Sequence, residues 1–174
     1  MKKFAWVAGS AMLLAACGGS QDVRVPVALG NLVLPSSAPW LQVDQQAKDV
    51  EVRGLDQSIT LTPAPPVSEV LQARLRHALQ PVYFTDLVVH CEQVFTEMRV
   101  DADATPPKVT LELGTRCTIN ARGLVSNHAY HVQPSLPAPA GGDYAKAFAS
   151  LLATGADDIA AQLRADVQAG IQRR

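Results

Sequence analysis

The longest regular pattern in the chain is an alternation of apolar and polar side chains from residue 108 to residue 122. Every second residue from Val109 to Ala121 is apolar except Thr115, and the residues between them are polar, charged or glycine. Successive side chains of a strand point to opposite faces, so this period of two predicts one long strand. One face of it belongs in a core and the other in water, as is typical of antiparallel sheets.

Shorter segments on both sides of this run also have the composition of strands. We expect strands at residues 49–53, 58–62, 87–91, 94–100 and 124–132. Residues 23–27 are expected to form an edge strand, because an edge tolerates Pro26. Three prolines (Pro63, Pro65 and Pro66) are expected to end the strand before them, and residues 134–142 to form a loop.

Two segments have the three- and four-residue apolar spacing of amphipathic helices. The first runs from Val67 to Leu79, and Pro81 follows it. The second begins after Asp143, a good N-cap residue, and its apolar stripe reaches Ile171. Gly155 lies in the middle of this stripe, where glycine costs ~1 kcal/mol relative to alanine. It therefore indicates a bend or a close contact.

The order of these segments predicts the fold class. It is an α+β domain, a mostly antiparallel sheet with two amphipathic helices packed on one face. We assign residues 48–174 to this single periplasmic domain. Residues 17–47 are interpreted as a lipidated tether and irregular N-terminal segment, and residues 1–16 as a signal peptide.

The beginning of the chain has the form of a secretory signal. Lys2 and Lys3 precede an uncharged apolar run from Phe4 to Ala16. A membrane-spanning helix needs roughly 20 apolar residues, and this run is shorter. A positive start, a short apolar run and small residues at its end are typical of a signal peptide.

Leu14-Ala15-Ala16-Cys17 resembles the lipobox of bacterial lipoproteins. The resemblance implies cleavage between Ala16 and Cys17, diacylglycerol on the Cys17 sulfur and an acyl chain on its new amino group. The membrane partner would then be bound through these acyl chains. Gly18, rather than aspartate, follows the cysteine, which by the same resemblance implies the periplasmic leaflet of the outer membrane. The alternatives are an ordinary signal peptide and a cytosolic protein with an apolar start.

The net charge restricts the partners of the mature chain. Without Lys2 and Lys3, 13 basic residues remain against 16 acidic ones, a net charge of −3. Nucleic-acid binding normally requires a basic patch, so we expect no nucleic-acid partner.

Two cysteines remain after Cys17, namely Cys91 and Cys117. In an oxidising compartment such a pair favours a disulfide, and both fall on the apolar faces of their expected strands. The alternative is a pair of free, buried thiols.

The sequence lacks the common catalytic motifs, and we predict neither an enzyme nor a cofactor. One metal-ligand set was considered, formed by His90, Cys91, Cys117, His128 and His131. His128 and His131 are three residues apart and would point to opposite faces of a strand, so we expect no metal site. The adjacent acids Asp157 and Asp158 are interpreted as a solvated helix face.

The segment Ser58–Pro63, followed by the helix Val67–Leu79, resembles the YajG-type family of bacterial lipoproteins. Members are similar to this chain in having a lipobox, a Thr-Leu-Thr-Pro-like segment before a helix, several strands and a long C-terminal helix. The resemblance implies no catalytic residues. The Cys91/Cys117 pair and the Pro-rich loop depart from that family.

These observations lead to three hypotheses of function. The favoured one is a non-catalytic binding or scaffold module of the cell envelope, with an envelope protein or a second copy as its partner. The same layout is also similar to auxiliary lipoproteins of envelope lipid or lipopolysaccharide transport complexes, which would require an apolar groove. A periplasmic enzyme would require a polar pocket with perturbed pKa values near His90 or His128.

Overall fold

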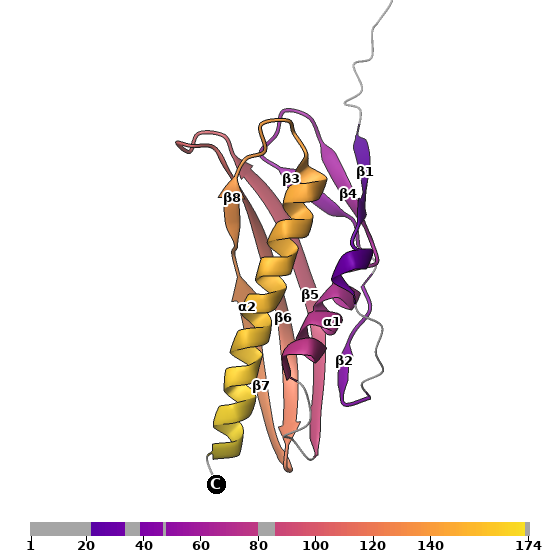
Figure 1. The fold of residues 1–174 in the computed structure, drawn as a ribbon, viewed down its shortest axis with the longest axis vertical. Helices are drawn as coiled ribbons and strands as arrows, with labels where there is room; N and C mark the ends of the chain where they lie inside the picture. Colours follow the sequence, from indigo (N-terminus) through magenta and orange to yellow (C-terminus); the bar gives the residue numbers. More distant parts are fainter. Residues whose placement is uncertain (1–21, 34–38, 47, 80–85, 173–174) are drawn as a thin grey trace, which may run out of the picture.

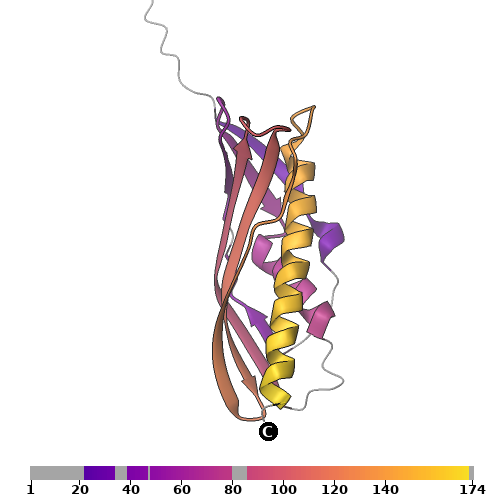
Figure 2. The ribbon, with the colours of Figure 1, turned by 90° about the vertical axis from the view of Figure 1, so that its left-hand side faces the viewer.

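The computed structural model describes residues 22–33, 39–46, 48–79 and 86–172. They form a two-layer α+β structure, with a twisted sheet on one side and two helices on the other (Figures 1 and 2). The segment that resembles a lipobox, with Ala16 and Cys17, lies outside the described residues. No helix in the described ranges combines the length and apolar character that crossing a membrane requires.

The described part of the chain contains eight strands, two α-helices and one 3-10 turn. In chain order they are β1 (Val23–Ala28), η1 (Gly30–Leu32), β2 (Leu41–Val43), β3 (Val50–Arg53), β4 (Ile59–Ala64), α1 (Val67–Leu79), β5 (Leu87–Asp101), β6 (Lys108–Ala121), β7 (Leu124–Val132), β8 (Ser135–Pro137) and α2 (Tyr144–Gln172).

The main path of the sheet runs β1-β4-β3-β5-β6-β7. Pairing is antiparallel in β3–β4, β5–β6, β6–β7 and β6–β8, and parallel in β1–β4, β2–β5 and β3–β5. The prediction of a mostly antiparallel sheet with two helices is therefore confirmed.

The strand predicted from the alternation corresponds to β6, and its apolar positions face the helices. Val109, Leu111 and Leu113 are fully buried, and β6 packs against α2, whereas α1 packs against β2 and β5. From the helix layer, apolar side chains of α1 and α2 complete this core, among them Leu71, Leu75, Phe148, Leu152, Ile159 and Leu163. The core therefore lies between the helices and one face of the sheet.

The strand β5 joins two segments that were expected separately. In its first part the buried residues are at odd positions, namely Leu87, Val89 and Cys91. In its second part they are at even positions, namely Val94, Met98 and Val100. A bulge between Glu92 and Phe95 makes this change, and Gln93 within it has φ 53°. Because one extra residue is inserted there, both halves of the strand direct their apolar side chains to the same core.

Three details differ from the expectations. Strand β4 continues through Pro63, which is possible because β3 pairs only with residues 59–61 and Pro63 lies beside β1 alone. Within the expected loop 134–142, residues Ser135–Pro137 form β8 and pair with the start of β6, beyond the end of β7. The expected edge strand at residues 23–27 is present as β1, but the segment before residue 48 is more regular than expected, since β2 also belongs to the sheet.

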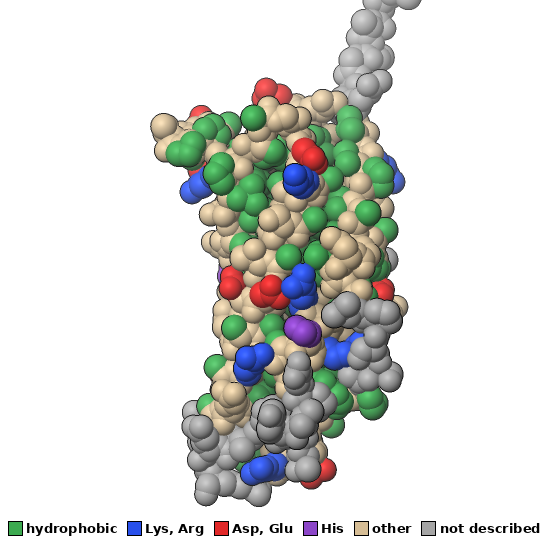
Figure 3. All heavy atoms as spheres, viewed as in Figure 1, with side chains coloured by type: hydrophobic (Ala, Val, Ile, Leu, Met, Phe, Trp, Pro, Cys, Tyr) green, Lys and Arg blue, Asp and Glu red, His purple; other side chains and the backbone are tan. Residues whose placement is uncertain are grey.

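The two helices end and pack as predicted. Asp143 Oδ1 accepts a hydrogen bond from Lys146 N at 3.0 Å, which caps α2. Asp157 and Asp158 are exposed as predicted. Arg74 Nη1 on α1 also donates to Asp157 on α2 at 3.2 Å. Figure 3 shows acidic and basic side chains next to one another near the middle of this helix-covered face.

Gly155 marks a close contact between α2 and the sheet. A Cβ atom at this position would lie 3.3 Å from Leu113 Cδ2 and from Pro134 Cγ. The missing side chain therefore allows the helix to approach β6.

We expect the substitution Gly155→Val to lower the free energy of unfolding by about 1–3 kcal/mol, since the added methyl groups overpack this contact. Urea denaturation measures the change. The matched control is Gly170→Val on the same helix, where a Cβ meets nothing within 4 Å. Equal effects of the two substitutions would contradict the close-packing interpretation.

Candidate functional site

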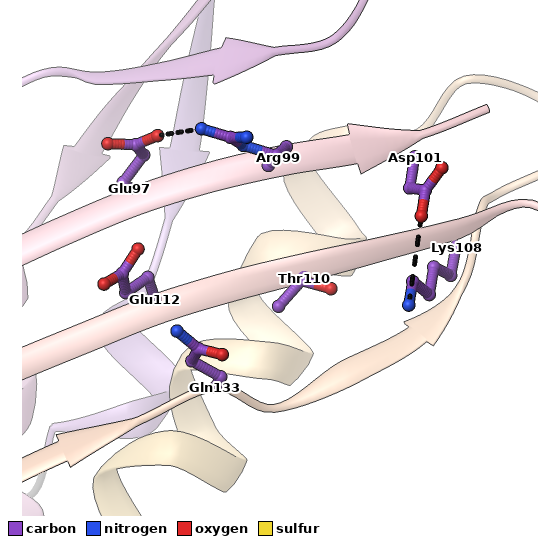
Figure 4. Close-up of a pocket in the computed structure, with 7 residues that line it drawn as sticks. All are labelled: Glu97, Arg99, Asp101, Lys108, Thr110, Glu112 and Gln133. Carbon is purple, nitrogen blue, oxygen red and sulfur yellow. Dashed lines mark hydrogen bonds and ion pairs between the residues drawn. The ribbon is translucent and has the colours of Figure 1, made fainter. Parts of the chain in front are cut away.

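The face of the sheet that is not covered by the helices carries an open groove of about 390 Å³. Figure 4 shows its lining, which comes from β5, from β6 and from the residue after β7. These residues are Glu97, Arg99, Asp101, Lys108, Thr110, Glu112 and Gln133. On β5 and β6 they alternate with core residues, so the pattern that builds the core also places charges on this face.

Ion pairs link the side chains of this surface. Glu97 Oε1 lies 3.2 Å from Arg53 Nη1 on β3 and 3.3 Å from Arg99 Nη2 on its own strand. Lys108 Nζ lies 3.9 Å from Asp101 Oδ2. Surface pairs of this kind contribute roughly 0–1 kcal/mol each, so stability alone does not require them.

A second open groove, of about 370 Å³, adjoins the first and shares Arg99 and Asp101 with it. Arg53, Gly54 and Val100 complete its lining. Gly54 has φ 85°, and a Cβ there would lie 2.1 Å from the Val100 carbonyl oxygen. Only glycine can therefore occupy this position without moving the backbone of β5.

Together the two grooves form what we call the charged groove, which is lined by residues of β3, β5 and β6 and by Gly54 and Gln133. Its arginine and lysine side chains can bind anions, and its carboxylates can bind cations or ammonium groups. No residue of the charged groove was singled out in the sequence. The available signal was the alternation of β5 and β6, because it predicts which charged residues point away from the core. These include Arg99, Asp101, Lys108 and Glu112.

The predicted disulfide between Cys91 and Cys117 is present in the structure. The two residues are direct partners in the β5–β6 ladder, and both are fully buried. This explains the pairing: a face shared by two neighbouring antiparallel strands places both sulfurs in the core.

The histidines do not converge on one site. His90 lies 2.8 Å from Asp44, and His131 Nε2 lies 2.6 Å from Glu112 Oε1. His131 is exposed, whereas His128 points towards α2, where it contacts Asp166, so the predicted opposite orientation is confirmed. Within the described residues, no group of three His, Cys, Asp or Glu side chains is arranged to hold a metal ion.

A chain of polar contacts between β7 and α2 was missed by the sequence interpretation. Ser126 Oγ lies 3.1 Å from His128 Nε2, and His128 Nδ1 lies 3.2 Å from Asp166 Oδ2 on α2. Tyr130 donates its hydroxyl proton to the same carboxylate oxygen at 2.8 Å. Burial, followed by the hydrogen bond and charge of Asp166, raises the pKa of Tyr130 above its usual value.

The order serine, histidine, aspartate is also that of nucleophilic triads. A nucleophilic site additionally needs a substrate cleft and oxyanion donors. Neither part of the charged groove is lined by Ser126, His128 or Asp166. We therefore interpret these contacts as a connection between β7 and α2.

No known protein family matches the sequence, and no curated protein matches it. Among solved structures, protein XCC0632 from Xanthomonas campestris, assigned to family DUF330, is similar with a TM-score of 0.52. The two are 15% identical, and the match covers 85% of this chain and 99% of that one. The likeness shows a shared fold.

A minor lipoprotein from Acinetobacter baumannii is similar at 13% identity and a TM-score of 0.49, over 76% of this chain and 93% of that one. The low TM-score adds no argument about function. Membership of the YajG-type family is not confirmed by any of these comparisons.

We expect the double substitution Cys91→Ala and Cys117→Ala to lower the free energy of unfolding by ~3 kcal/mol. The bridge joins positions 26 residues apart and so restricts the unfolded chain. Thermal unfolding of both forms measures the loss. If reduction of the wild-type protein left its melting temperature unchanged, the stabilising role would be contradicted.

Proposed function

We propose that the mature chain is a lipoprotein, acylated at Cys17, in the periplasmic leaflet of the outer membrane. It acts there as a non-catalytic binding or scaffold module. The observation that carries the proposal is Leu14-Ala15-Ala16-Cys17 at the end of a short apolar run with a positive start. Two or more acyl chains give stable anchoring, at ~0.8 kcal/mol per buried CH₂.

The position of the folded domain supports an anchor of this kind. Five peptide steps separate Cys17 from Asp22, the first described residue, and extended chain covers about 3.4 Å per residue. Asp22 therefore lies within about 17 Å of the anchored cysteine. Such a short tether holds the domain close to the membrane surface.

A binding role rather than catalysis is supported by the charged groove. Its carboxylates are paired with arginine, lysine or histidine side chains, and it is open to solvent. Open, ion-paired surfaces recognise charged partners. The accessory role in lipid transport would be favoured by an apolar groove, and the groove described here is lined with charges.

We expect Cys17→Ser to release the protein from the outer-membrane fraction or to leave it uncleaved in the inner membrane. The reason is that serine has no thiol to receive diacylglycerol. Sucrose-gradient fractionation followed by immunoblotting measures the distribution. The double variant Cys91→Ala and Cys117→Ala serves as control and should remain in the outer membrane. An unchanged distribution of Cys17→Ser would contradict the proposal.

The partner is tested separately by crosslinking an epitope-tagged copy in intact cells, followed by mass spectrometry. A transporter subunit recovered in near-equal amount would replace the scaffold role by the accessory role. Recovery of this chain with itself or with another envelope protein supports the scaffold role. Hydrolase or transferase activity that a point mutation abolishes would contradict both.

A further inference from the structure

Two arginines lie side by side in the charged groove. Arg53 of β3 and Arg99 of β5 are direct partners in the parallel β3–β5 pairing. Like charges at such neighbouring positions destabilise a sheet. Glu97 contacts both guanidinium groups and is mostly buried, with 19% of its side chain exposed. One carboxylate therefore holds two arginines together.

Both arginines keep donors for a further anion. A guanidinium group has five N–H donors, and Arg99 uses only Nη2 in its ion pair. Arg53 uses Nε and Nη1, the former in a longer, exposed contact of 3.8 Å with Glu51. Their side chains are 53% and 67% exposed, so the remaining donors face the groove and solvent. Paired guanidinium forks are well suited to phosphate oxygens.

Carboxylates flank the arginines in the same groove: Asp101 lies two residues beyond Arg99 on β5, and Glu112 lies opposite Glu97 in the β5–β6 ladder. Asp101 and Glu112 line the groove together with Thr110 and Gln133 (Figure 4). Lys108 and His131 are paired with these two acids. The groove thus presents arginine donors next to acceptors for an ammonium group. Because a bare anion would meet the acids, a ligand that carries both charges fits it better.

The groove lies at the end of the sheet where the described chain begins. One row of paired residues crosses the sheet from β1 to β6. In order across the strands, it consists of Val23, Ile59, Val52, Met98 and Leu111. The groove residues Arg99 and Thr110 are adjacent to the last two positions of this row. Figure 1 shows the start of β1 and the β5–β6 turn at the same end.

Three strand spacings separate β1 from β5, about 14 Å at ~4.8 Å each. Added to the tether of about 17 Å, this limits the distance between Cys17 and the groove to about 31 Å, so the groove can contact the headgroups of the anchoring membrane. The described end of the sheet and its short tether therefore allow a mixed-charge groove to face a phospholipid surface.

We propose that the charged groove binds a zwitterionic phospholipid headgroup, with the phosphate on Arg53 and Arg99 and a primary ammonium on Asp101, which lies two residues beyond Arg99 on β5. The inference rests on the proposed anchor at Cys17, which supplies the proximity. It gives the domain a fixed orientation, with the β6–β7 hairpin directed away from the membrane and exposed to envelope partners.

The test uses the full acylated protein in vesicles, with the photoreactive residue benzoylphenylalanine at Thr110 in the groove. Intact-mass spectrometry counts phospholipid adducts after illumination, in phosphatidylethanolamine or in phosphatidylcholine vesicles. We expect more adducts with phosphatidylethanolamine, because the quaternary ammonium of phosphatidylcholine cannot donate hydrogen bonds. The same label at Asn127, eight residue steps or about 27 Å further along the sheet, should give few adducts.

The test variant is Arg99→Gln, in which Glu97 keeps its ion pair with Arg53, so the fold should be retained. We expect it to lower the adduct yield about tenfold, as for loss of one charge-assisted contact. The matched control Arg24→Gln removes an exposed arginine at the same end of the sheet but outside the groove, and should leave the yield unchanged.

Equal yields in the wild type and Arg99→Gln, or at Thr110 and Asn127, would overturn the headgroup site. Suppression of the adducts by micromolar soluble glycerophosphoethanolamine would assign the groove to a free solute and overturn it as well. The same spectra report the acyl chains on Cys17. Acylated protein without adducts overturns only the headgroup site, whereas unacylated protein overturns the proposed function.

Discussion

The antiparallel ladder between β5 and β6 is the element on which the rest of the structure depends. Its register runs from Leu87 opposite Ala121 to Asp101 opposite Lys108, with one bulge, and the Cys91–Cys117 bridge lies within it. On one face the ladder supplies the floor for both helices. On the other face, the same alternation produces the charged groove. Core and candidate site are therefore two consequences of one pattern.

The sequence predicts much of this architecture because the signals are local. The alternation in β6, the apolar stripes of α1 and α2 and the cap at Asp143 each lie within one element, and each is confirmed. The turn at Arg122 and Gly123, with φ 52° and 79°, likewise follows from a local glycine. Gly155 also had a local signal, although only the structure shows that it marks a close contact with the sheet.

The features that the sequence did not predict depend on pairing between distant segments. Arg53 and Arg99 come together only because β3 pairs in parallel with β5, and no local pattern contains that choice of partner. The bulge at Gln93 and the short strand β8 are adjustments to neighbouring strands. Asp166 completes the chain from Ser126 and His128 only when α2 lies over β7. Most of the candidate site is therefore non-local in origin.

The position of the site also connects it to the anchor. One end of the sheet carries both the start of β1 and the charged groove, and the opposite end carries the β6–β7 hairpin. In the proposed function, with a lipid anchor at Cys17, this arrangement separates a membrane-facing end from an end open to periplasmic partners. The likeness to protein XCC0632 extends to the fold alone, and a shared fold does not by itself imply a shared function.

The most direct test of this account is the mass of the N-terminal tryptic peptide of the protein purified from its native membranes. The account predicts a peptide that begins at Cys17, ends at Arg24 and carries the mass of a diacylglyceryl group together with an amide-linked acyl chain. An unmodified peptide, or a peptide that begins upstream of Cys17, would contradict the lipid anchor and the membrane proximity derived from it.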